Sequence, residues 1–173
     1  MSSNFKEWST KLSYVMTLFL FSGLMGGTAL GLERPRIQTA LILVDPGFSR
    51  FSLEVARRIQ ARLNAGGIAA KLTPAREFNA EDVKGVDLIV IGGPTYAGQP
   101  SPQIKKLLSK LPPTSELKAL LFSTGGSDGS GLEPLTRMAE EKGLSILGAA
   151  KFLQKTGQGP GLDKRIGELL EGI

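Results

Sequence analysis

The sequence predicts an α/β protein built on a doubly wound, five-stranded parallel sheet. Segments of β-prone apolar residues alternate five times with segments that have helical spacing. The apolar segments are continuous rather than alternating, which is typical of strands buried on both faces. Loops rich in small residues separate the segments, with 22 glycines and 10 prolines in 173 residues. This order of elements is characteristic of a parallel sheet with helices on both faces.

The first half of the chain supplies three strands and one long helix. Thr39–Val44 is the first expected strand, Ile68–Leu72 the second and Asp87–Ile91 the third. Between the first two strands, Gly66-Gly67 ends a helix. The buried face of that helix is expected to consist of Val55, Ala56, Ile59 and Leu63.

The second half repeats the pattern. A helix is expected after Ser101, which is its N-cap, with Pro102 in the first helical position and Pro112-Pro113 at its end. The elements expected after it are a strand at Ala119–Phe122, a helix with the apolar face Leu132, Leu135, Met138 and Ala139, a strand at Ser145–Phe152, and a short helix at Lys164–Leu170 capped by Asp163.

Composition excludes several kinds of chemistry. The chain has no cysteine and no histidine, so disulfides, thiol nucleophiles, histidine bases and the common zinc sites are all excluded. Neither a GxxxxGK[ST] motif nor a GxGxxG motif after a strand is present, which argues against the usual nucleotide-binding loops. The net charge is +5, but no run of Lys and Arg interleaved with aromatic residues occurs, so we expect no nucleic-acid partner.

The N-terminal part predicts a membrane segment. Residues 12–32 contain no charged side chain, and a helix of this length spans about 30 Å, the thickness of the hydrocarbon core. Trp8 and Tyr14 lie near one end, where aromatic rings settle in bilayers. The alternative is a signal peptide cleaved after Ala29-Leu30-Gly31. The expected organisation is therefore a tail at 1–11, a transmembrane helix or signal peptide at 12–32, a linker at 33–37 and a domain at 38–173.

Three strand-to-helix loops hold the candidate functional residues: Asp45–Ser52, Gly92–Gly98 and Ser123–Gly131. Open α/β sheets bind ligands at the carboxyl ends of their strands, where the strand order reverses. With the strand order 2-1-3-4-5, all three loops are expected to converge on one crevice. The second loop presents Tyr96, which is placed to stack on a flat ring.

The first loop is a candidate phosphate site. Ser49, Ser52, the backbone amides and the N-terminus of the following helix can all donate hydrogen bonds to an anion. Arg50 adds a positive charge. The alternative is that Ser52 only caps the helix and Arg50 is solvated.

The loops carry a resemblance to the flavodoxin-like family over residues 38–173. The most specific segment is GGPTYAGQPSP with the helix after it, followed by LFSTGGSDGSG; in the first loop, Arg50 stands where the family usually has glycine. The resemblance implies the cofactor FMN, with its phosphate at the first loop and its ring at the other two. The residues that it assigns to the cofactor are Gly47, Ser49, Arg50, Ser52, Pro94, Thr95, Tyr96, Ala97, Thr124, Gly125 and Gly126.

The resemblance implies a membrane-tethered FMN redox protein with a domain in the cytoplasm, or an exported one after signal cleavage. It leaves open whether the protein is an electron carrier or an FMN-dependent oxidoreductase that uses a redox partner protein, a quinone or NAD(P)H. Flavodoxin carriers are typically acidic and this chain is basic, which counts against an ordinary carrier. The second hypothesis is a flavodoxin-like module without cofactor that acts as a membrane-bound interaction partner.

Overall fold

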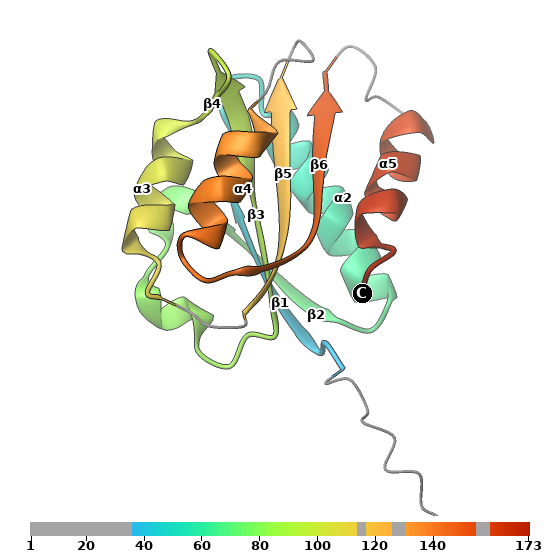
Figure 1. Ribbon diagram of the computed structural model, residues 1–173. Helices are drawn as coiled ribbons and strands as arrows, with labels where there is room; N and C mark the ends of the chain where they lie inside the picture. Colours follow the sequence, from blue (N-terminus) through green and yellow to red (C-terminus); the bar gives the residue numbers. More distant parts are fainter. Residues whose placement is uncertain (1–35, 114–116, 126–130, 155–159) are drawn as a thin grey trace, which may run out of the picture. The chain divides into compact units, whose positions relative to one another are not determined.

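Five parallel strands form the central sheet of the computed structural model, which describes residues 36–113, 117–125, 131–154 and 160–173 (Figure 1). The strands run in the spatial order β2-β1-β3-β5-β6. This order is the predicted 2-1-3-4-5, with β4 as an added short strand outside that path. The five parallel strands are β1 (Thr39–Val44), β2 (Ala69–Pro74), β3 (Leu88–Tyr96), β5 (Lys118–Gly125) and β6 (Ser145–Leu153).

Helices cover both faces of the sheet. One hydrophobic layer is formed with α2 (Phe51–Ala65) and α5 (Pro160–Leu170), and the other with α3 (Pro102–Lys110) and α4 (Leu132–Glu140). Two short 3-10 helices, η1 (Ala75–Glu77) and η2 (Ala80–Val83), connect β2 to β3. Alternate residues of the central strands enter opposite layers, as Ile42 and Leu43 of β1 do, so these strands are buried on both sides.

Strand β3 is longer than the sequence predicts. The expected end was Ile91, but the strand continues through Gly92 to Tyr96 because Gly92, Gly93 and Pro94 stay in parallel register with residues 122–124 of β5. A Cβ atom at Gly92 would lie 2.3 Å from the ring of Phe122, so only glycine leaves room for that ring. The stretch Gly92–Tyr96 is therefore strand, and the predicted loop is reduced to a tight turn.

That turn joins β3 to the short antiparallel strand β4 (Gln99–Pro100). Tyr96 pairs with Gln99, and the two intervening residues, Ala97 and Gly98, have φ of 47° and 75°. Positive φ at both positions is typical of the type I′ hairpin turn. The left-handed conformation costs a non-glycine residue about 1–2 kcal/mol, so the turn holds Ala97 under strain at the edge of the sheet.

Other boundaries differ from the prediction as well; β2, expected at Ile68–Leu72, is Ala69–Pro74. Helix α5 begins at Pro160 rather than near Lys164, so Asp163 lies inside the first turn instead of capping the helix. Strand β5 extends beyond Phe122 to Gly125, which places Ser123 and Thr124 in the sheet.

The N-terminal part of the chain is a unit of its own. Residues Met1–Arg36 separate from the compact unit Ile37–Ile173. The second unit contains every strand of the described residues and both hydrophobic layers, so we expect it to fold by itself. The predicted transmembrane or signal segment, 12–32, lies outside the described residues. Among the helices that the structure does describe, none is long and apolar enough to cross a bilayer.

Candidate functional site

Thr124, at the carboxyl end of β5, connects two of the three predicted loops. Its Oγ1 atom lies 2.6 Å from Oγ of Ser52, in the first turn of α2. Its carbonyl oxygen accepts a hydrogen bond of 3.3 Å from the hydroxyl of Thr95, near the end of β3. Ser52 and Thr124 are 1% and 3% exposed, so the contact between them is excluded from water. The first and second loops are thus both bonded to one residue of the third.

Close packing joins the loops as well. Gly47 has a φ of +61°, and a Cβ atom there would lie 2.8 Å from the Cγ atom of Pro94. Gly131, at the N-terminus of α4, approaches Thr95 so closely that its Cβ atom would lie 2.1 Å from Thr95 Cγ2. Backbone therefore packs directly on a side chain at both contacts, and the predicted convergence of the loops at this edge of the sheet is found.

Two aromatic rings lie at the rim of this edge. Phe48, in the first loop, is 97% exposed, and Tyr96, at the end of β3, is 42% exposed. Their ring centroids are 6.4 Å apart with an interplanar angle of 62°, an edge-to-face contact. The sequence reasoning selected Tyr96 and missed Phe48. The signal for it was a large aromatic residue directly after the turn-forming pair Pro46-Gly47.

The environment of Tyr96 raises the pKa of its hydroxyl. Partial burial is the main cause, and the negative charge of Asp45 adds to it. Asp45 itself is held in place because its Oδ1 atom accepts a hydrogen bond of 3.1 Å from the backbone N–H of Gly47. The Tyr96 hydroxyl therefore stays protonated at neutral pH and is a hydrogen-bond donor at the rim.

The first loop turns into α2 without a side-chain cap. Arg50 is the N-cap residue in a left-handed conformation with φ of 57°, and its side chain makes no capping hydrogen bond. The Ser49 hydroxyl accepts a weak contact of 3.4 Å from the N–H of Phe51. The N–H groups of Phe48, Ser49 and Arg50 donate to no atom of the described residues. Unsatisfied amides before a helix form a surface that favours anions.

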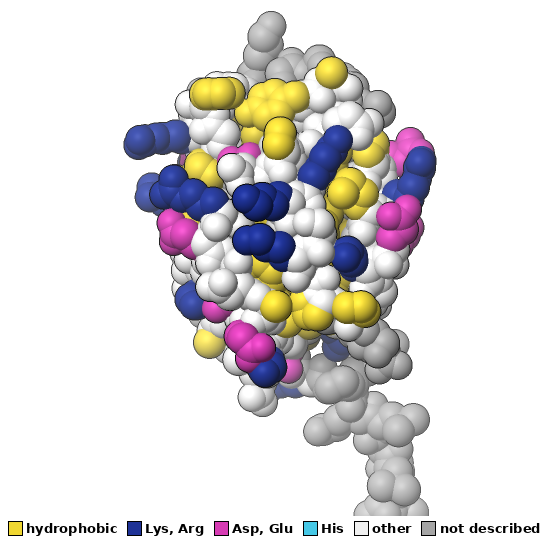
Figure 2. Space-filling view, turned by 90° about the vertical axis from the view of Figure 1, so that its left-hand side faces the viewer, with side chains coloured by type: hydrophobic (Ala, Val, Ile, Leu, Met, Phe, Trp, Pro, Cys, Tyr) yellow, Lys and Arg dark blue, Asp and Glu magenta, His cyan; other side chains and the backbone are white. Residues whose placement is uncertain are grey.

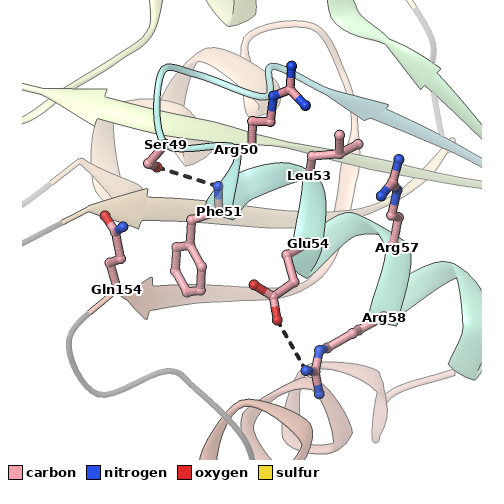
Figure 3. A pocket seen from close by; sticks show the side chains of 8 residues that line it. All are labelled: Ser49, Arg50, Phe51, Leu53, Glu54, Arg57, Arg58 and Gln154. Atoms are coloured by element: carbon pink, nitrogen blue, oxygen red, sulfur yellow. Dashed lines mark hydrogen bonds and ion pairs between the residues drawn. The ribbon is translucent and has the colours of Figure 1, made fainter.

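A shallow hollow of about 460 Å³ lies beside the start of α2 (Figure 3). Figure 3 shows Arg50 and Arg57 pointing to one side of α2, and Glu54 with Arg58 pointing to another. The basic side chains outnumber the single acidic one, so the hollow attracts anions. Its walls are Ser49, Arg50, Phe51, Leu53, Glu54, Arg57, Arg58 and Gln154.

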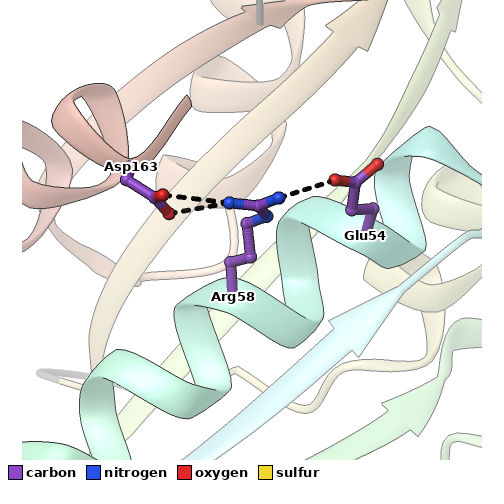
Figure 4. A network of polar contacts seen from close by, with 3 residues as sticks. All are labelled: Glu54, Arg58 and Asp163. Carbon is purple, nitrogen blue, oxygen red and sulfur yellow. Dashed lines mark hydrogen bonds and ion pairs between the residues drawn. The ribbon is translucent and has the colours of Figure 1, made fainter. Parts of the chain in front are cut away.

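The guanidinium of Arg58 is paired with two carboxylates of the protein (Figure 4). Its NH1 atom donates to both carboxylate oxygens of Asp163 at 3.0 Å, and its NH2 atom donates to Glu54 at 3.1 Å. The hydrogen bond to Asp163 is the main reason why the pKa of Arg58 is raised. The ion pair fastens α5 to α2 and leaves Arg50 and Arg57 as the cations of the hollow without an ion pair among the described residues.

The other predicted site residues fall into two groups. Pro94, near the end of β3, and Ala97, in the turn after it, lie at the rim. Gly125 is the last residue of β5, and its carbonyl oxygen accepts a hydrogen bond of 3.0 Å from the N–H of Gln154. Gly126 lies outside the described residues. The hydroxyls of Ser52 and Thr95 are engaged within the protein, so their contact with a ligand stays a prediction.

Comparison with known proteins identifies the class of fold. No protein-family model matches the sequence, and no curated protein matches it. Solved structures do match, and many of them are flavodoxins. This chain therefore has a flavodoxin-like fold, with flavodoxins and flavodiiron proteins as structural neighbours.

Three of these structures show the extent of the similarity. Oxidised flavodoxin 2 of Bacillus cereus has a TM-score of 0.67 and 16% identity over 78% of this chain and 97% of its own. The two-electron reduced flavodoxin of Megasphaera elsdenii has a TM-score of 0.65 and 22% identity over 75% of this chain and 96% of its own. Rubredoxin:oxygen oxidoreductase of Desulfovibrio gigas has a TM-score of 0.63 and 12% identity over 80% of this chain but only 35% of its own length. At these identities the likeness concerns the fold.

Proposed function

We propose that this chain is an FMN-binding redox protein. The observation that carries the proposal is the joining of three strand-end loops at Thr124, through contacts of 2.6 Å to Ser52 and 3.3 Å to Thr95. Such a convergence at the carboxyl edge of a doubly wound sheet is where this class of fold binds ligands. The flavodoxins among the structural neighbours, one oxidised and one reduced, support a redox role.

The donor set of the first loop fits a phosphate. The N–H groups of Phe48, Ser49 and Arg50 have no acceptor among the described residues, and they precede the positive end of the α2 dipole. The exposed hydroxyl of Ser49 and the guanidinium of Arg50 can add charge-assisted hydrogen bonds. In this arrangement Ser52 supports the loop from inside, and Gly47 lets the loop approach Pro94.

The rim fits a flat ring. Tyr96 offers an exposed aromatic face, and the strained turn at Ala97 presents backbone groups beside it. The end of β5 at Thr124 and Gly125 supplies further backbone groups for a polar ring edge. Phe48 contacts Tyr96 edge to face but is 97% exposed, so little packing holds it there and its ring can move aside for a ligand.

In this proposal, bound FMN supplies one- and two-electron transfer, and the protein binds, orients and tunes it. Because Tyr96 and Phe48 are exposed, a flavin ring held at this rim would be open to a protein partner, a quinone or NAD(P)H. We propose electron transfer or flavin-dependent reduction as the activity. We further propose that residues 12–32 attach the chain to a membrane with the domain in the cytoplasm.

The test is the visible absorption spectrum of purified Ile37–Ile173, followed by titration with FMN. We expect flavin absorption bands in the purified protein, or quenching of FMN fluorescence with a dissociation constant in the micromolar range or below. Riboflavin, which lacks the phosphate, is the matched control ligand and is expected to bind more weakly. A colourless protein that binds neither compound contradicts the proposal and favours an interaction module without cofactor.

A further inference from the structure

The outer side of α3 carries lysines and no acidic residue. Lys105, Lys106 and Lys110 are all exposed, and we call them the lysine face. Lys106 and Lys110 are four residues apart, so they lie one above the other on the helix surface. Among the described α-helices, α3 alone contains neither Asp nor Glu.

Each of the other described α-helices contains at least one internal ion pair, and α3 contains none. No ion pair within the described residues involves the lysine face. A pair of like charges at this spacing destabilises a helix by about 0.2–0.5 kcal/mol, so the arrangement does not serve the stability of α3. The internal pairs on the other helices are Glu54–Arg58, Glu133–Arg137 and Lys164–Glu168.

The lysine face starts beside the candidate site. The N–H of Ser101, the N-cap of α3, donates to the carbonyl oxygen of Pro94 at 3.1 Å, which fixes the start of the helix next to the end of β3. Lys142 approaches the other end of α3 and donates to the carbonyl oxygen of Ser109 at 3.5 Å. Figure 2 shows Lys and Arg side chains in a band across the side of the molecule that contains α3, below a group of hydrophobic side chains.

We propose that the lysine face, together with the exposed ring of Phe48, docks a protein partner whose acidic surface surrounds an apolar centre. Complementary charge accelerates and orients protein association, and a solvent-exposed aromatic residue is a typical anchor of an interface. An anionic membrane is the alternative occupant, at about 1 kcal/mol for each lysine near its surface, and the vesicle arm of the test separates it. The purpose of this docking, electron exchange at the rim beside Tyr96, rests on the proposed function.

The test uses Ile37–Ile173 and a fluorescein-labelled, glutamate-rich peptide with a leucine at its centre. The peptide stands in for the partner surface, and its binding is followed by fluorescence anisotropy at low salt without added FMN. The test variant is Lys105→Glu/Lys106→Glu/Lys110→Glu. The matched control, Arg62→Glu/Lys71→Glu/Arg165→Glu, changes the net charge equally at exposed positions of α2, β2 and α5 that form no ion pair among the described residues.

We expect the lysine-face variant to bind the peptide about tenfold more weakly, and the control to change by less than about twofold. The milder triple Lys→Gln variant is expected to lie between them, which keeps the test informative if the Glu variant does not fold. Phe48→Ser is expected to weaken binding of this peptide but not of poly-glutamate. Equal losses in both triple variants, or no loss in either, overturn the proposal.

A second arm separates the lipid alternative. It measures binding of Ile37–Ile173 to vesicles of phosphatidylserine and phosphatidylcholine. Vesicle binding that depends on the lysine face, with no binding of the peptide, also overturns the proposal. Because no flavin is needed in either arm, a failure of FMN binding and a failure of docking are distinguishable.

Discussion

The contact between Ser52 and Thr124 can be tested by a double-mutant cycle. Both hydroxyls are buried, and their oxygens are 2.6 Å apart. Ser52→Ala leaves the Thr124 hydroxyl without this partner, and Thr124→Val does the same to Ser52. An unsatisfied buried polar group costs about 1–3 kcal/mol, so each single change is expected to lower the free energy of unfolding by that amount.

The double variant Ser52→Ala/Thr124→Val removes both partners and leaves no orphan. Replacing both partners by apolar groups is nearly neutral. The loss in the double variant is therefore expected to be smaller than the sum of the single losses, with a coupling free energy of about 1 kcal/mol or more.

The assay is urea unfolding of Ile37–Ile173, with m-values compared to confirm that all variants unfold in the same two-state transition. Ser123→Ala is the matched control, because Ser123 Oγ is buried on the same strand but has no hydrogen-bond partner among the described residues. Its removal is expected to be neutral or stabilising. Strictly additive losses from Ser52→Ala and Thr124→Val refute the idea that these residues join the loops.

Three further predictions concern the ring of Tyr96 at the rim, the carboxylate of Asp87 and the close packing of Gly131 against Thr95. Tyr96→Ala should lower the affinity for FMN by about 0.5–1.5 kcal/mol in a fluorescence titration while Tyr96→Phe keeps it, and unchanged affinity removes Tyr96 from the ring site. The backbone N–H groups of Gln38 and Thr39 lower the pKa of Asp87, so its contribution to stability is present above the ordinary carboxyl pKa and is lost as pH falls through the lower folded value. Urea midpoints measured at decreasing pH should show this acid loss in the native protein and a smaller loss in Asp87→Asn; identical profiles contradict the assignment. Gly131→Ala should destabilise by about 1–3 kcal/mol because its Cβ meets Thr95, whereas the control Gly167→Ala, which meets nothing within 4 Å, should be neutral or stabilising; equal effects in thermal unfolding argue against the close approach.

The central strands could be predicted because their signals are local. Thr39–Val44 is a continuous run of β-prone residues, and the structure has the same bounds for β1. The helix after Ser101 also follows the sequence, since the Ser101 hydroxyl accepts from Ile104 N at 3.3 Å and Pro102 begins α3. The order of the five parallel strands was predicted correctly as well, and only β4 was not expected.

The end of β3 could not be predicted, because its cause is not local. Gly92, Gly93 and Pro94 are typical of a loop, yet pairing with β5 keeps them in the sheet. Helix α5 also begins earlier than its spacing indicates, and its Asp163 is bound by Arg58, which lies 105 residues earlier in the chain. Sequence spacing gives no information on such a contact.

The candidate site was predicted in position but not in detail. The approach of the three loops followed from the strand order, whereas the partner of each hydroxyl did not. Ser52 has the sequence context of a phosphate ligand or a helix cap. In the structure it is the second residue of α2, and its hydroxyl contacts the hydroxyl of Thr124. Phe48 was missed because exposure of a single loop aromatic depends on the path of the loop, here set by Gly47 against Pro94.

The most direct measurement of the central claim is an NMR titration of isotope-labelled Ile37–Ile173 with FMN. Chemical-shift changes are predicted at backbone amides of Gly47–Arg50, of Tyr96 and Ala97, and of Thr124 and Gly125, all saturating at one equivalent of flavin. Shift changes confined to any one of these three segments, or located elsewhere on the domain, contradict a shared site at the carboxyl edge of the sheet.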